Sequence, residues 1–210
     1  MYKDKFKKFG GEWIPDIVEY IKEYVKERPG ITISVGCDSL QKRRRTLYAM
    51  TIMMYNHDIR NGAHVVFFRE SVPKVKNTFV RLQKEAEYAQ DIAEYLNDEL
   101  GKFYQRKDID DLKRKQYKYH IDRCDGKHEH VELHNLENFV SNMILTDYEK
   151  VREYKLVDIH LDFNPVLNEG KNQSNISYHS FVPALRGMGY RVFAKPIAYA
   201  ATSAADLLLK

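Results

Sequence analysis

Apolar and polar residues alternate along residues 31–40, ITISVGCDSL, with the period of two that is typical of a β-strand. We predict a strand over about 31–37, with Ile31, Ile33, Val35 and Cys37 on its apolar face and Thr32, Ser34, Gly36 and Asp38 on the other. Aspartate is unfavourable in a strand, and a partly buried charge is costly unless it is paired. Asp38 therefore either caps the following turn through Ser39 or joins other carboxylates at one site.

Similar patterns predict the other elements. Apolar residues spaced by three and four predict one helix that begins at Pro15 and ends before Pro29, and a second helix over 77–100. β segments are predicted at 46–55, 63–72, 156–163 and 191–196, with a helix within 175–190 and a short closing helix at 201–210. The first three strands have short connections, which favours an antiparallel meander. We therefore expect an α/β fold with a mixed five-stranded sheet, in which three antiparallel strands precede two α-linked strands, flanked by helices.

Composition limits the class of protein. A chain of 210 residues fits a single domain, here with a polar, charged insert at about 101–150. The net charge of +4 is compatible with a polyanionic partner and does not demonstrate one. Two cysteines make no disulfide framework, and we find no secretory signal or long apolar span. We expect a cytoplasmic protein with no membrane contact and no disulfide-linked partner, and the oligomeric state stays open.

Further carboxylates are predicted close to Asp38. In the strand at 156–163, Asp162 lies near the carboxyl end on the more polar face, together with His160. If the two strands are parallel neighbours, Asp38 and Asp162 stand side by side, and because like charges repel, a divalent cation between them is expected. On the long helix, Glu85 lies at the margin of the apolar stripe, whereas Glu87 points into solvent.

A fourth acid, Asp206, falls early in the closing helix. Thr202 or Ser203 is predicted to cap this helix, and Leu207, Leu208 and Leu209 to dock it. Docking would bring Asp206 to the other acids. The simpler interpretation is an acid that stabilises a helix amino terminus, and the sequence leaves both open.

Several segments together resemble a known family. They are WIPDIVEYIKEYVKERPG (13–30), VGCDSL (35–40), RLQKEAE (81–87), IHLDFNP (159–165) and GMGYRVFAKPIAYAATSAADLLLK (187–210). With the predicted element order, they resemble the ribonuclease H-like nucleases and, more closely, the YkuK-type family of predicted ribonuclease H-like proteins. The resemblance spans most of the chain except about 101–150.

The resemblance implies that Asp38, Glu85, Asp162 and Asp206 form the acidic set that is both catalytic and metal-binding, with Mg²⁺ or Mn²⁺ as the cofactor. Such hard cations prefer carboxylate oxygens, and two of them can promote phosphodiester hydrolysis. The expected function is a metal-dependent nuclease, and the alternative is a catalytically inactive nucleic-acid-binding or assembly module. Whether the partner is RNA, DNA or a hybrid stays open.

Other residues are weaker candidates. Arg43, Arg44 and Arg45 form either a solvated turn or a phosphate-binding segment, and Lys195 is a candidate for the same role. Ser39 and His160 are expected to orient the acids, although a hydrogen-bonded sheet histidine is the simpler interpretation of His160. In the insert, Asp125-Gly126 predicts an exposed hairpin, which we favour over a zinc site made by Cys124 and nearby histidines.

Overall fold

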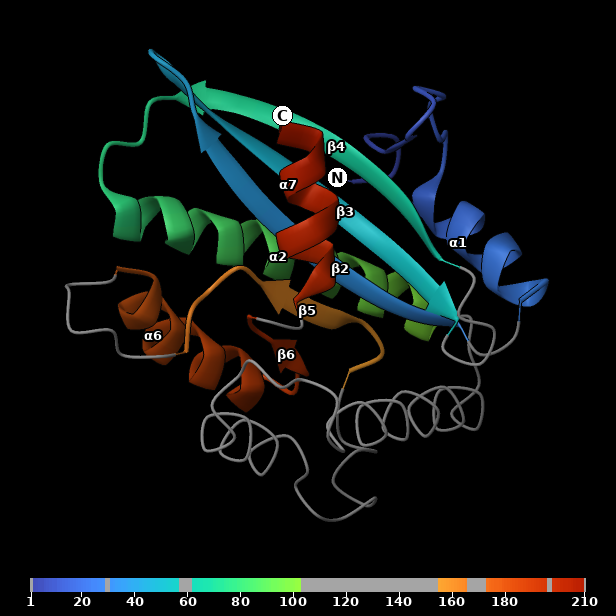
Figure 1. Ribbon diagram of the computed structural model, residues 1–210. Coiled ribbons are helices and arrows are strands. Elements are labelled where there is room, and N and C mark those ends of the chain that lie inside the picture. Colours follow the sequence, from blue (N-terminus) through green and yellow to red (C-terminus); the bar gives the residue numbers. More distant parts are fainter. Residues whose placement is uncertain are drawn as a thin grey trace.

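The protein is built around one six-stranded mixed sheet, with the strand order β1-β4-β3-β2-β5-β6 (Figure 1). The structure is a computed structural model that describes residues 2–28, 31–56, 62–102, 155–165, 173–195 and 198–209. The strands are β1 (Lys7–Lys8), β2 (Ile31–Gln41), β3 (Arg45–Asn56), β4 (Ala63–Pro73), β5 (Asp158–Leu161) and β6 (Val192–Phe193). The helices are α1 (Ile17–Lys26), α2 (Thr78–Gly101), α6 (Gln173–Gly187), the π-helix η1 (Ala200–Ala205) and α7 (Asp206–Leu209).

The pairing confirms the predicted mixed sheet. β2, β3 and β4 form the antiparallel meander, and β5 and β6 extend it as parallel strands beyond β2. The sixth strand, β1, was not predicted. It adds Lys7 and Lys8 to the free edge of β4, and two lysines carry no alternation from which a strand could be recognised.

The sheet has two unlike faces. The back face carries Val35, Cys37, Met50 and Leu161, which pack in one apolar cluster with α1 and α2. The front face carries the small and polar residues of β2 and is crossed by η1 and α7 (Figure 1). The small side chains allow this close crossing, since a Cβ added at Gly36 would lie 2.5 Å from the backbone nitrogen of Ala201.

Several boundaries differ from the predictions. β5 and β6 are shorter than the strands predicted at 156–163 and 191–196, and α6 begins at Gln173, before the predicted 175. β2 continues to Gln41 rather than ending near residue 37, because its polar end stays paired with β3. The first helix begins at Ile17 rather than at Pro15. Its N-cap is Asp16, whose Oδ1 accepts hydrogen bonds from the backbone N–H groups of Val18 and Glu19.

The closing helix also differs from the prediction. It begins at Ala200 as a π-helical turn with no side-chain cap, so the expected cap at Thr202 or Ser203 is wrong. The Thr202 hydroxyl instead donates to the Ala198 carbonyl at 3.1 Å. Leu208 and Leu209 are buried as expected, but Leu207 is 62% exposed.

The charged insert predicted at 101–150 lies outside the described residues apart from Gly101 and Lys102, so the single domain with an insert stays a prediction. Among the helices that are described, none combines the length and apolarity needed to cross a membrane. Cys37 is a buried free thiol.

Candidate functional site

A pocket of about 460 Å³ lies where the carboxyl-terminal ends of β2 and β5 meet the first turns of α2 and α6. Three of the four predicted acids, Asp38, Glu85 and Asp162, line it. The other lining residues are Ser39, Thr78, Arg81, Leu82, Gln173, Ser174 and Lys195. The structure therefore brings together carboxylates that are far apart in sequence.

The parallel pairing of β2 with β5 places Asp38 beside Asp162. Cys37 is in register with Leu161, so the next residue of each chain segment lies on the front face at neighbouring positions. Burial raises the pKa of Asp38 to about 6, and the charges of Asp162 and Asp206 add to this rise. The backbone N–H of Ser39 opposes the rise by donating to Asp38 Oδ1 at 2.7 Å. Asp38 makes this local hydrogen bond within a strand, not as the cap of a turn.

Glu85 reaches the pocket from the back face. Its side chain is 1% exposed, and its Oε1 accepts from the Ser39 hydroxyl at 2.5 Å and from Arg81 Nη1 at 3.2 Å. Its Oε2 is buried and has no hydrogen-bond partner among the described residues. Burial raises the pKa of Glu85 to about 8, with a further contribution from Asp38, while the Ser39 hydrogen bond and Arg81 act in the opposite direction. Glu87 is exposed, as predicted.

Arg81 belongs to this site and was not predicted. Besides Glu85, its Nη1 contacts the Ser39 hydroxyl at 2.6 Å and the Ser39 carbonyl at 3.2 Å. It thereby ties α2 to the end of β2. The signal in the sequence is its position four residues before Glu85, which places both side chains on one face of a helix.

Lys195 and Asp162 form an ion pair across the pocket. The Lys195 Nζ lies 3.0 Å from Asp162 Oδ1. Burial raises the pKa of Asp162, and the hydrogen bond and charge of Lys195 act against that rise. Lys195, predicted from sequence as a phosphate contact, therefore also neutralises one of the acids.

Asp206 does not line the pocket, but it faces the same group of acids. Its charge contributes to the raised pKa values of both Asp38 and Asp162, after burial as the main cause. Asp206 is partly buried at the start of α7. Its proximity to the other acids depends on how η1 sits on the sheet.

Residues of three strands contact the backbone of Ala200, where η1 begins. The Ala200 N–H donates to His160 Nδ1 at 3.1 Å, and the Ala200 carbonyl accepts from Thr51 Oγ1 at 2.7 Å. Gly36 lies directly beneath this peptide. His160 is thus a hydrogen-bonded sheet histidine that positions the C-terminal helix. It is not among the residues that line the pocket.

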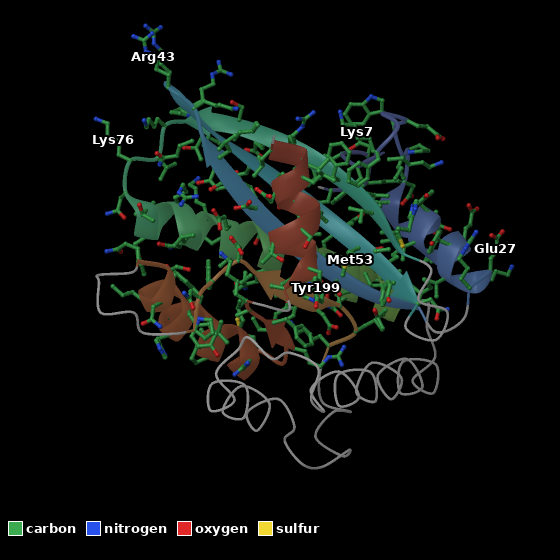
Figure 2. All side chains as sticks on the ribbon, viewed as in Figure 1. Lys7, Glu27, Arg43, Met53, Lys76 and Tyr199 are labelled. Atoms are coloured by element: carbon green, nitrogen blue, oxygen red, sulfur yellow. The ribbon has the colours of Figure 1, made fainter. Side chains whose placement is uncertain are left out.

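The predicted basic segment lies at the tip of the β2–β3 hairpin, beside the loop that joins β4 to α2. The Lys74 N–H donates to the Arg44 carbonyl at 3.2 Å, and Gln41 donates to the Val75 carbonyl at 2.7 Å. Figure 2 shows Arg43 and Lys76 projecting from these two loops at the same end of the sheet. Arg43, Arg44 and Arg45 do not line the pocket, and Lys74 and Lys76 extend their basic surface.

The residues of this site have the donor atoms that a metal ion needs, but they are not yet placed to bind one. Its donors are carboxylate oxygens, the ligands that Mg²⁺ and Mn²⁺ prefer, and one buried oxygen of Glu85 has no partner in the part of the chain that is described. Within that same part, however, no group of three or more acidic, histidine or cysteine side chains is placed to hold an ion. The donor chemistry therefore fits, and binding requires the carboxylates to approach one another.

The sheet order and the flanking helices define a mixed α/β protein. The family model described as Ribonuclease H-like matches residues 14–210, and the chain belongs to this family. No curated protein and no solved structure matches the chain.

Proposed function

We propose that the protein is a divalent-metal-dependent nuclease that hydrolyses phosphodiester bonds in nucleic acid. One observation carries the proposal: Asp38, Glu85 and Asp162 line a single pocket although they come from three separate elements. Family membership supports it, because the fold is nuclease-like. The proposed cofactor is Mg²⁺ or Mn²⁺.

Each acid has a proposed role. Asp38, Glu85 and Asp162 would hold one ion, and Asp206 would help to hold a second. Ions held there would supply the chemistry of phosphodiester hydrolysis, by activating a water and by stabilising the leaving oxygen. Ser39 and Arg81 hold the Glu85 carboxylate in place through their contacts with its Oε1.

The basic residues have a proposed role in binding the substrate backbone. Lys195 lies inside the pocket, where its ammonium can contact a phosphate once Asp162 binds an ion. Beyond the carboxyl-terminal end of β2, a cationic surface suited to phosphates further along the nucleic-acid strand is formed by Arg43, Arg44, Arg45, Lys74 and Lys76. Phosphate contacts of this kind carry no base specificity, which suits RNA, DNA or a hybrid.

The proposal is tested by incubating the protein with RNA, DNA and hybrid substrates in Mg²⁺, Mn²⁺, Ca²⁺ or EDTA. We expect cleavage of at least one substrate with Mg²⁺ or Mn²⁺, and little with Ca²⁺, whose looser coordination places the attacking water poorly. Asp38→Asn should remove cleavage and leave the folded structure intact, with Glu87→Gln as a control for loss of an exposed acid. Full activity of Asp38→Asn on the same substrate would show that the mechanism is wrong.

A second candidate is a catalytically inactive nucleic-acid-binding or assembly module. The observation that favours it is the pairing of Asp162 with Lys195 and of Glu85 with Arg81, which neutralises two acids without a metal. This candidate predicts that the protein binds nucleic acid equally well in EDTA and in Mn²⁺, and that it cleaves none of the substrates.

A further inference from the structure

The N-terminal segment builds an aromatic and basic surface that is distinct from the acidic pocket. Lys7 of β1 is paired with Phe67 of β4 and forms an isolated bridge with Trp13, so these residues follow one another across the front face. The ring of Phe9 lies 5.5 Å from that of Phe67. Trp13 is 63% exposed and Phe9 is 50% exposed. We call Lys7, Phe9, Trp13, Phe67 and Arg69 the N-terminal surface.

Two cations lie among these rings. The Lys7 Nζ is 5.5 Å from the centre of the Trp13 ring and 5.3 Å from that of Phe67. The Arg69 guanidinium is 5.8 Å from the centre of the Phe67 ring. Among the described residues, no carboxylate forms an ion pair with Lys7 or Arg69, and the nearby Glu12 pairs with Lys8 at 2.9 Å. The surface therefore combines exposed π-faces with unneutralised positive charge.

The N-terminal surface adjoins the helix that carries Asp206. Arg69 Nη1 donates to the Leu208 carbonyl of α7 at 3.1 Å, and Phe67 packs in one cluster with Leu208 and Leu209. In Figure 2, Lys7 lies on the other side of α7 from Arg43. Arg69 of β4 is in register with Asp38 across two strand spacings, so the surface begins about 10 Å from Asp38.

Exposed aromatic rings interleaved with cations are suited to single-stranded nucleic acid. Unpaired bases stack on aromatic side chains whatever their sequence, while lysine and arginine contact the phosphates. A base within a duplex has no free face for such stacking. The charge also fits, because residues 2–13 carry four lysines against two acids.

We infer that the N-terminal surface binds single-stranded RNA or DNA, with a base stacked on Trp13 and phosphates beside Lys7 and Arg69. The inference deepens the proposed function, on which it rests for the nature of the ligand. It assigns the unpaired part of the substrate to a surface that begins about 10 Å from Asp38. A second copy of the chain is the competing occupant, and the experiment separates the two.

The test measures the affinity of full-length protein for fluorescent single-stranded RNA, single-stranded DNA and duplexes of about 20 nucleotides. EDTA is present throughout, so that binding does not depend on cleavage. We expect Trp13→Ala to weaken single-strand binding about 5- to 150-fold, the range for loss of one stacked base. Trp13→Phe should stay close to the parent because it keeps a π-face. Met188→Ala, which removes a different exposed apolar side chain, should have no effect.

Salt dependence gives an independent readout for Lys7. Loss of one phosphate contact on a single strand should reduce the slope of log affinity against log salt concentration by about 0.7 in Lys7→Ala. A Trp13 effect restricted to RNA or to DNA identifies the ligand and supports the inference.

Three results would overturn the inference. In the first, Trp13→Ala binds single strands as tightly as the parent does. In the second, Trp13→Ala weakens duplex binding as much as single-strand binding. In the third, light scattering shows that Trp13→Ala changes the oligomeric state while its affinity for single strands stays the same. A parent that binds single strands through Trp13 but cleaves nothing contradicts the nuclease proposal alone.

Discussion

At the scale of single residues, Glu85 is the most deeply buried of the three acids that line the pocket. It is a carboxyl group with 1% of its side chain exposed, held by Ser39 and Arg81 through one oxygen only. Desolvation disfavours its charged form, which is why its pKa is raised to about 8. A pH dependence of stability follows from this shift.

We expect the metal-free protein to lose stability as the pH rises from about 4.5 to about 8. A raised pKa means that the folded protein holds the Glu85 proton more tightly than the unfolded chain does. The resulting stability is fully present below the unfolded pKa and is lost as the pH rises through the folded one. The loss should be on the order of a few kcal/mol.

Glu85→Gln should remove this part of the pH dependence, because an amide keeps an acceptor for Ser39 and Arg81 and does not ionise. The measurement is urea unfolding in EDTA across this pH range, with Glu87→Gln as the matched exposed control on the same helix. Identical pH profiles for the parent and Glu85→Gln would show that Glu85 is already ionised in the folded protein.

At the scale of elements, the C-terminal helix depends on the sheet for its position. η1 and α7 together are too short to be stable alone, so their packing on β2 and β3 determines where Asp206 lies. The backbone of Ala200 is held by residues of three strands, which are His160 of β5, Thr51 of β3 and Gly36 of β2. The position and the charge of Asp206 can therefore be altered separately.

Gly36→Ala should displace the helix, because the added Cβ would lie 2.5 Å from Ala201 N and 2.6 Å from Ala200 C. We expect a loss of about 1–3 kcal/mol in stability and a fall in turnover. Asp206→Asn should lower turnover by orders of magnitude while substrate affinity stays close to that of the parent. The measurement is turnover at limiting Mg²⁺ for each single variant and for the double variant.

If Gly36 acts on turnover through Asp206, the double variant should be little worse than Asp206→Asn alone. Independent, additive losses would contradict this coupling. Unchanged turnover in Asp206→Asn would show that Asp206 only stabilises the end of its helix, and that the site consists of the other three carboxylates.

The elements also show what could be predicted from sequence. Period-two alternation located β2 and β5, and the parallel pairing of these two strands, which was a condition of the prediction, places Asp38 beside Asp162. The π-helical start of η1 could not be predicted, because it is determined by Ala200 contacts with residues 40 and 149 positions away. Arg81 was missed because its partner Ser39 is 42 residues distant, although its spacing from Glu85 was visible.

At the scale of the whole molecule, one sheet organises three surfaces. The acidic pocket lies at the carboxyl-terminal ends of β2 and β5, and the basic hairpin tip extends beyond the same end of β2. The N-terminal surface lies across α7 from that tip. The acids of the site thus lie in a pocket, while basic residues lie on both sides of α7, an arrangement that suits a long polyanion with one phosphate at the acids.

The most direct test of the proposed metal site is a crystal structure of the protein soaked with Mn²⁺, using the anomalous signal to locate the ion. The account predicts a peak between Asp38 and Asp162, about 2.1 Å from a carboxylate oxygen of each, with Glu85 at its edge and Lys195 released from Asp162. A pocket without Mn²⁺, in which Lys195 still pairs with Asp162 and Arg81 with Glu85, would contradict the account.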